Sequence, residues 1–314
     1  MNNELIFAMG QPRSGTTLLQ RIIMTSGQVC CPSEPWLLLP GLRMFEKGYR
    51  ITDYDHSVFL RAFNGLKTPQ GEVARLWERA VADFYLDWVS TVSDKPKFLD
   101  KTPRYYLIIT DLLRIFDNAK FLLTVRNPLA VMASIAETWY KGVARWDRHQ
   151  IDLITAPGLI ANALQLGDPR IHPIRYEDLA SQERGPAVVA SLESFLGIKV
   201  RLDCLSEQRI TGRFGDPINR DTKTISAQSV DKWQAFFRTP FRKKKGRDTL
   251  RKIGRNNLRQ MGYDMGSLER MLSEIPIDWT LSLRESLGMG PSRTVSKRES
   301  KVRFKTRQAS IHFY

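Results

Sequence analysis

Short apolar runs alternate with amphipathic stretches along most of the chain. The apolar runs predict strands at residues 4–10, 97–100, 120–125 and 171–174, with a short extended piece at 28–31. Apolar positions spaced three and four residues apart predict helices, which we place at residues 16–26, 72–92, 103–116, 128–140, 157–166, 186–196, 229–238, 247–261 and 266–274. This alternation is typical of an α/β protein whose helices cover both faces of a central parallel sheet.

Residues 36–95 interrupt that alternation and are predicted to form a helical insertion. Its best helix is 72–92, on which one apolar stripe is expected to pack against the domain. The stripe comprises Val73, Leu76, Trp77, Ala80, Val81, Phe84, Tyr85 and Trp88.

The loop after the first strand has the strongest chemical signal. Between that strand and the first helix stands the sequence Gln11-Pro12-Arg13-Ser14-Gly15-Thr16-Thr17. A strand, a glycine-bearing loop and a helix direct backbone N–H groups and the positive end of the helix dipole at an anion. Gly10 and Gly15 have the spacing of a nucleoside triphosphatase P-loop, but the lysine of that motif is replaced by Thr16. Arg13 supplies a cation inside the loop instead, which favours a different phosphate-bearing ligand.

A second element lies about 110 residues further along. The strand 120–125 ends at Arg126, and Pro128 is suited to the first turn of the next helix. Ser134 follows Arg126 by eight residues, about two helical turns, so both side chains can face one crevice.

Together the two elements resemble the PAPS-dependent sulfotransferases, PAPS being 3′-phosphoadenosine 5′-phosphosulfate. The resemblance is closest to the branch that includes protein-tyrosine sulfotransferases and many bacterial enzymes, and it covers residues 5–35 and 97–136, with weaker similarity at 171–179 and 215–233. It implies a P-loop-like three-layer fold in which the loop binds the 5′-phosphosulfate and Arg126 and Ser134 bind the 3′-phosphate. The acceptor would then be selected by residues 36–95 and 140–165.

The resemblance also implies catalytic and further nucleotide-binding residues. Lys101, after the strand 97–100, resembles the lysine that contacts the leaving or transferring group, and Glu34 resembles the catalytic base. A helix cap for residues 36–46 is the alternative role for Glu34, and His56 and His149 are weaker candidates for the base. We expect Arg13 and Lys101 to lie at loop–helix junctions outside the core. The residues implied to contact PAPS are Arg13, Ser14, Gly15, Thr16, Thr17, Arg126, Ser134, Tyr176, Lys223 and Lys232.

Two departures from the tyrosine-sulfating branch bear on the acceptor. That branch has an arginine at the position of Thr138, and it pairs a cysteine at the position of Cys31 with one at the position now held by Leu99 or Asp100. We therefore expect transfer to a hydroxyl of a carbohydrate or metabolite. The alternatives are a protein-tyrosine sulfotransferase, a P-loop small-molecule kinase and a non-catalytic polyanion-binding protein.

Composition and charge complete the prediction. The net charge of +15 is carried by residues 238–259 (+9) and 291–314 (+6), which are predicted to form a solvated helix face and a flexible tail or, alternatively, a peripheral membrane contact. Aromatic residues are too sparse there for nucleic-acid stacking. The cysteines lack metal-ligand spacing, and no apolar run approaches a membrane span of about 18–20 residues. We expect a metal-independent, cytoplasmic enzyme with one domain at residues 1–290.

Overall fold

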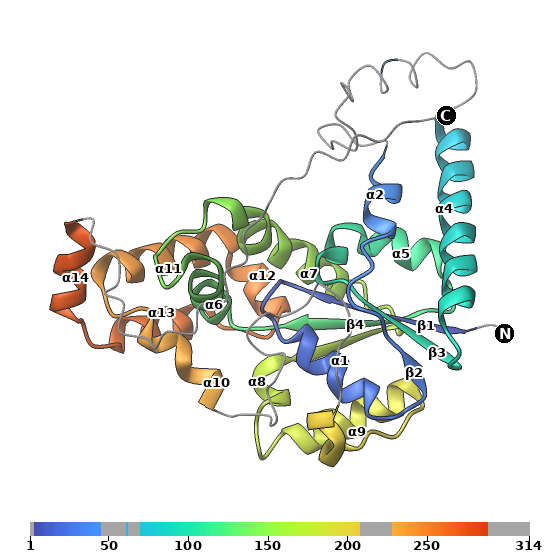
Figure 1. Ribbon diagram of the computed structural model, residues 1–314. Helices are drawn as coiled ribbons and strands as arrows, with labels where there is room; N and C mark the ends of the chain where they lie inside the picture. Colours follow the sequence, from blue (N-terminus) through green and yellow to red (C-terminus); the bar gives the residue numbers. More distant parts are fainter. Residues whose placement is uncertain (1–2, 45–60, 62–69, 208–227, 288–314) are drawn as a thin grey trace, which may run out of the picture.

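Five parallel strands form the centre of the molecule in a computed structural model that describes residues 3–44, 61, 70–207 and 228–287. The strands follow the order β2-β3-β1-β4-β5 (Figure 1). Their bounds are Glu4–Gly10 for β1, Val29–Cys30 for β2, Lys97–Lys101 for β3, Lys120–Val125 for β4 and Ile171–Arg175 for β5. The predicted parallel α/β architecture is confirmed.

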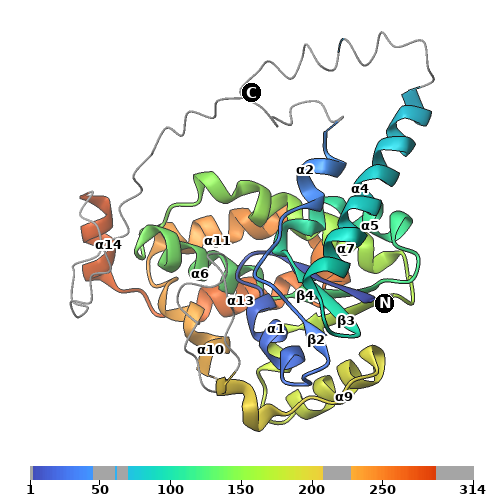
Figure 2. The same cartoon turned by 45° about the vertical axis from the view of Figure 1, so that its right-hand side comes forward.

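Each face of the sheet has its own apolar core, because side chains along a strand point alternately to opposite faces. Ile6 and Ala8 of β1 pack with α1 (Thr16–Met24) and α9 (Gly185–Leu196). Phe7 and Met9 pack on the other face, whose core includes residues of α5 (Ile109–Ile115), α6 (Pro128–Tyr140) and α7 (Ala156–Gln165). Figure 2 shows α1 and α9 on one side of the strands and α5 and α7 on the other.

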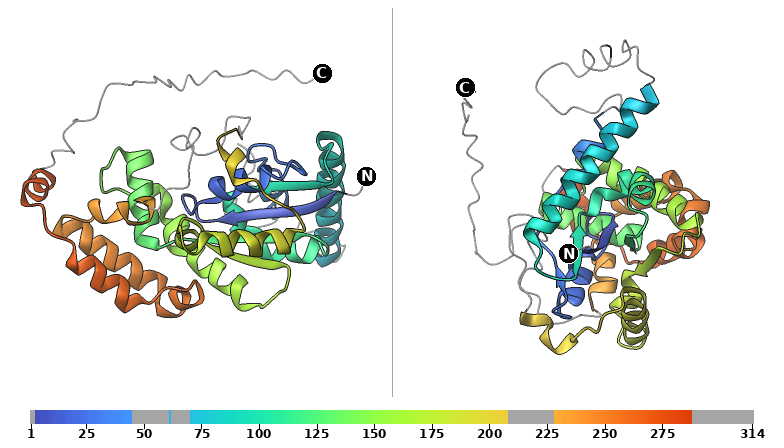
Figure 3. Two further views of the ribbon diagram at one scale, coloured as in Figure 1. Left: turned by 90° about the horizontal axis from the view of Figure 1, so that it is seen from below. Right: turned by 90° about the vertical axis from the view of Figure 1, so that its right-hand side faces the viewer.

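Further helices gather at the end of the sheet where the strands terminate, as the orange segments in the left view of Figure 3 show. They are α10 (Gln228–Asp231), the 3₁₀ helix η5 (Lys232–Ala235), α11 (Pro240–Ile253), α12 (Arg255–Gln260), α13 (Met265–Glu274) and α14 (Trp279–Ser286). Sequence reasoning missed α14 and expected one helix at 247–261. The chain instead begins α11 at Pro240, capped by the Thr239 side chain, and ends it before Gly254, whose φ of 86° breaks the helix.

Two other helical predictions need correction. Residues 103–116 form a 3₁₀ helix, η1 (Pro103–Ile108), followed by α5, rather than one helix. The long helix α4 (Gln70–Val92) exists, but its predicted stripe is only partly correct. Tyr85 is buried and Val81 and Trp88 pack against the core, whereas Leu76 and Phe84 are 61% and 60% exposed. The reason is its position at the edge of the fold, beside α2 (Leu38–Leu42) and α5, where only a narrow face is covered (Figure 1).

Candidate functional site

The glycines of the loop are required by close packing. Gly15 caps α1 with a left-handed φ of 99°, and a Cβ atom there would clash with the ring of Tyr176. A Cβ atom at Gly10 would clash with the hydroxyl and carbonyl of Thr124 at the end of β4. The loop is thus held between α8 (Tyr176–Leu179) and β4, at the edge where the parallel strands end.

The two elements predicted from sequence meet in this structure. Arg13 Nε donates a hydrogen bond to Ser134 Oγ at 3.0 Å, and Arg126 Nη1 donates to the carbonyl oxygen of Arg13 at 2.8 Å. The Arg126 guanidinium also lies 4.1 Å from the ring centroid of Tyr176, a cation–π contact. Burial lowers the pKa of Arg126, and the positive charge of Arg13 lowers it further. Two cations therefore lie together where a phosphate-bearing ligand was predicted.

The hydroxyl residues of the loop have different environments. Ser14 is buried, and its Oγ lies 2.6 Å from Thr124 Oγ1, so it fixes the loop to β4. Thr16 is buried and Thr17 is half-buried in the first turn of α1, the part of a helix whose N–H groups lack intrahelical partners. The first turn of α1 can therefore offer backbone donors to an anion.

Lys101 and Glu34 form an ion pair at the same edge of the sheet. Lys101 ends β3 beside Ala8 of β1, and its Nζ donates to Glu34 Oε1 at 2.7 Å. The lysine side chain is fully buried and that of Glu34 is 13% exposed, so Lys101 lies in the core rather than outside it as expected. Glu34 is not a helix cap, because α2 begins at Leu38 and has Leu37 at its N-cap position.

The segment before Glu34 is anchored to α1. The Gln20 amide donates to Cys31 Sγ at 3.0 Å and to the Pro32 carbonyl at 3.4 Å. Burial raises the pKa of the Cys31 thiol to about 12, so this cysteine stays protonated and is a poor nucleophile. Cys30 and Cys31 are both free thiols.

A protein-family model described as the sulfotransferase family matches residues 5–201 of the 314-residue chain. The chain belongs to this family. It is 27% identical over 297 residues to nodulation protein NoeE of Sinorhizobium fredii, covering 83% of this chain and 66% of that protein. It is 25% identical over 244 residues to protein-tyrosine sulfotransferase 2 of Gallus gallus, covering 73% of this chain and 62% of that protein. The chain thus spans less than two thirds of these relatives' lengths.

A solved structure agrees with the fold. The sulfotransferase domain from the curacin biosynthetic pathway superposes with a TM-score of 0.56 at 23% identity, over 83% of this chain and 98% of that domain. The predicted sulfotransferase family, its similarity to the tyrosine-sulfating branch and the P-loop-like fold are therefore confirmed.

A buried aspartate that sequence reasoning missed joins the sulfotransferase loop to its surroundings. Asp152 lies in a π-helix, η3 (Ile151–Thr155), and its backbone oxygen accepts from the Gln11 amide at 2.8 Å. Its carboxylate oxygens accept from Arg104 Nε and Nη2 at 2.8 and 2.7 Å and from the Tyr106 hydroxyl at 2.7 Å. Burial opposes the charge of Asp152, but these donors hold its pKa below the ordinary value. Asp152 thus joins three segments, the loop through its backbone carbonyl and η1 through its carboxylate, to η3.

His149 also belongs to this cluster. Its Nδ1 lies 3.1 Å from Asp152 Oδ2, and its ring stacks on Trp139 at a centroid distance of 4.6 Å. The hydrogen bonds place His149 with Asp152 and not with the Lys101–Glu34 pair. His56 lies outside the described residues. No sequence signal marks Asp152, because a π-helix has no recognisable pattern and its contacts with Gln11, Arg104 and Tyr106 come from distant segments.

The remaining nucleotide-binding predictions have different outcomes. Tyr176 packs against the loop as described above. Lys232 is exposed in η5. Burial raises the pKa of Glu137, which lies one helical turn beyond Ser134, and the positive charges of Lys232 and Arg13 partly offset that rise. Lys232 therefore lies within electrostatic range of the helix that bears Ser134. Lys223 lies outside the described residues.

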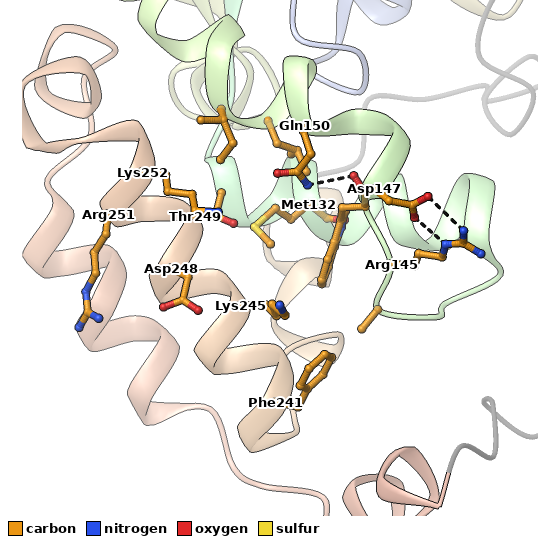
Figure 4. A pocket seen from close by; sticks show the side chains of 14 residues that line it. Met132, Arg145, Asp147, Gln150, Phe241, Lys245, Asp248, Thr249, Arg251 and Lys252 are labelled. Atoms are coloured by element: carbon orange, nitrogen blue, oxygen red, sulfur yellow. Dashed lines mark hydrogen bonds and ion pairs between the residues drawn. The ribbon is translucent and has the colours of Figure 1, made fainter.

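The basic stretch 238–259 makes most of its contacts away from this site, although the charge of Arg242, like that of Lys232, partly offsets the raised pKa of Glu137. A separate cavity of about 530 Å³ lies between α11 and residues 144–154, and Lys245 and Lys252 are among its lining residues (Figure 4). Arg242 and Lys243 are instead buried and bind protein groups, Arg242 the Glu285 carboxylate at 2.6 Å and Lys243 the Ser273 carbonyl at 3.0 Å. None of the residues that we predicted for the site lines this cavity.

In the described part of the chain, no group of three or more His, Cys, Asp or Glu residues is arranged to hold a metal ion. No helix among the described residues is long and apolar enough to cross a membrane.

Proposed function

We propose that this sulfotransferase transfers the sulfuryl group of PAPS to a hydroxyl of a carbohydrate or other metabolite. The observation that carries the proposal is the junction of Arg13, Arg126 and Ser134. Two guanidinium groups repel each other when they are brought together out of water, and an anion between them relieves that repulsion. A nucleotide with phosphate groups at both its 5′ and 3′ positions has an anion for the loop and another for Arg126 and Ser134.

The chemistry follows from charges that develop during transfer. The bond between sulfur and the acceptor oxygen forms while the bond between sulfur and the phosphate oxygen breaks, and negative charge grows on the leaving phosphate. Arg13, Lys101 and the N–H groups at the start of α1 stabilise that charge. Glu34 accepts the proton of the attacking hydroxyl, since a carboxylate oxygen bound to Lys101 retains further lone pairs.

Acceptor class and location are part of the same proposal. Thr138 and Asp100 depart from the pattern of the tyrosine-sulfating branch. These differences favour a small hydroxyl acceptor over a tyrosine peptide. A tyrosine peptide is the second candidate, because two relatives are named protein-tyrosine sulfotransferases.

The free thiols of Cys30 and Cys31 are compatible with a reducing cytoplasm.

Calorimetry with nucleotides tests the donor. We expect the desulfated product, 3′-phosphoadenosine 5′-phosphate (PAP), to bind more tightly than ATP or AMP, because Arg126 and Ser134 contact a 3′-phosphate. Arg126→Ala should remove most of the advantage of PAP over AMP, about 10- to 100-fold for a charge-assisted hydrogen bond. ATP binding as tightly as PAP would contradict the assignment. Turnover of PAPS with lactose, an alkyl glycoside and a tyrosine peptide then compares the acceptor classes.

A further inference from the structure

Trp36 has an unusual backbone conformation two residues after Glu34. Its φ of 60° is left-handed, a region that a bulky aromatic residue rarely adopts. Such a conformation persists only where surrounding contacts enforce it, and it is common at functional sites. The contacts of the Trp36 side chain therefore indicate what the strained backbone serves.

The indole of Trp36 binds the proposed base. Its Nε1–H donates to Glu34 Oε2 at 3.1 Å, while Lys101 Nζ donates to the other oxygen, Oε1, at 2.7 Å. Each carboxylate oxygen thus has one fixed donor, and the plane of the carboxylate is set by two groups from different segments. Lys101 alone would leave the carboxylate free to rotate about one contact.

The ring of Trp36 is also contacted by the guanidinium group of Arg104. The Arg104 guanidinium carbon lies 5.8 Å from the ring centroid, and Arg104 is fixed by its two hydrogen bonds to the buried Asp152 carboxylate. The backbone carbonyl oxygen of Asp152 accepts from the Gln11 side-chain amide of the loop. A continuous series of contacts therefore runs from the phosphate-binding loop through Asp152, Arg104 and Trp36 to Glu34.

We propose that Trp36 is a positioning residue for sulfuryl transfer, holding the Glu34 carboxylate in the orientation that accepts the proton of the acceptor hydroxyl. This inference rests on the proposed function. Trp36 acts through Glu34 and need not touch the donor. Its indole N–H is the group that matters, and Arg104 holds the ring in place.

Trp36→Phe tests the inference because it keeps an aromatic ring and removes the N–H donor. With PAPS and the best acceptor of the panel above, we expect kcat to fall about 10- to 100-fold, as for the loss of a hydrogen bond to a charged group. The Kd of PAP should change by less than about twofold, since the loop is unaltered. Trp279→Phe is the matched control, because Trp279 is 71% exposed in α14, and its kcat should equal that of the wild type.

A double-mutant cycle separates positioning from a structural effect. Glu34→Gln alone should lower kcat about 10²- to 10⁴-fold, as expected for a lost general base. Adding Trp36→Phe to Glu34→Gln should then cost nothing more, because the carboxylate through which Trp36 acts is gone. An equal loss from Trp36→Phe in both backgrounds, or a wild-type kcat for Trp36→Phe, would overturn the inference.

A second variant guards against misfolding. If Trp36→Phe melts well below the wild type, Arg104→Lys is used in its place. This variant keeps a positive charge for Asp152 but loses the planar guanidinium that lies over the Trp36 ring. It should lower kcat by a smaller factor than Trp36→Phe, and this loss should vanish in the Glu34→Gln background. An Arg104→Lys loss that persists there would overturn the inference. Wild-type protein that transfers no sulfuryl group from PAPS to any acceptor contradicts the proposed function itself, whereas an active wild type with an unaffected Trp36→Phe contradicts only the role of Trp36.

Discussion

Two regions of this sulfotransferase concentrate positive charge, and they use it differently. In the loop site, Arg13 and Arg126 lie together, with a serine hydroxyl and a loop carbonyl among their hydrogen-bond partners. In α11, the buried Arg242 binds a carboxylate and the buried Lys243 binds carbonyl groups of the following segment. The first arrangement gathers like charges at the ends of parallel strands, where an anion can bind, whereas the second neutralises them within the protein. Buried positive charge alone therefore does not indicate a binding site, because in α11 it is bound by carboxylate and carbonyl groups of the protein.

The largest expected effect is a loss of turnover that occurs on substitution in the loop site but not in α11. Arg13→Ala should lower turnover about 10³-fold or more, because it removes a cation proposed to stabilise the leaving phosphate. Arg251→Ala is the matched control, since Arg251 is exposed on α11 and pairs only loosely with Glu269 at 3.8 Å. Steady-state kinetics on both variants should show normal turnover for Arg251→Ala. A comparable loss in both would remove the distinction between the regions.

The next effect separates them by stability. Arg242 is buried and binds Glu285, the Phe236 carbonyl and the Gly142 carbonyl, so Arg242→Met leaves acceptors from three segments without their donor. We expect the free energy of unfolding to fall by about 2–4 kcal/mol, while turnover per folded molecule is unchanged. Urea denaturation together with kinetics checks both points. A stable but inactive Arg242→Met protein would place α11 in the catalytic machinery after all.

The smallest effect is a pH dependence beside Lys101. Asp100 is buried and accepts from Tyr85 and Thr102, and burial raises its pKa from 3.8 to about 6. The folded state therefore binds more protons than the unfolded chain between about pH 4 and 6, so stability falls as pH rises through that interval. Above about pH 6 the ionised carboxylate costs about 1–3 kcal/mol.

Asp100→Asn should remove that cost. The stability of the variant relative to the wild type is expected to grow from pH 4.5 to 7 and then level off, as measured by denaturation at each pH. A difference that is constant across this range would show that Asp100 has the same protonation state in the folded and unfolded chains.

The sequence predicted correctly those strands and helices whose bounds are marked by residues close together in the chain. The strand bounds at 4–10 and 120–125 and the helix bounds at 128–140 agree with the structure, because apolar runs, Pro128 and the buried face of the helix are all local features. The stripe of α4 was only partly correct, since periodicity shows which residues share a face but not how much of that face another element covers. The start of α11 was missed although Thr239 and Pro240 signal it.

The sequence by itself determined the family, the parallel α/β fold and the residues of the loop, because glycine spacing, Arg13 and the Arg126–Ser134 pair are set by short-range geometry. Only the tertiary structure decided which of these residues meet and what surrounds them. The fold brings Lys101 to Glu34 and brings Arg104 and Tyr106 to Asp152. Packing also orients the Trp36 indole so that it donates to Glu34. Such contacts depend on where the sheet brings distant strand ends together and on a strained backbone angle, and neither is encoded in any local pattern of residues.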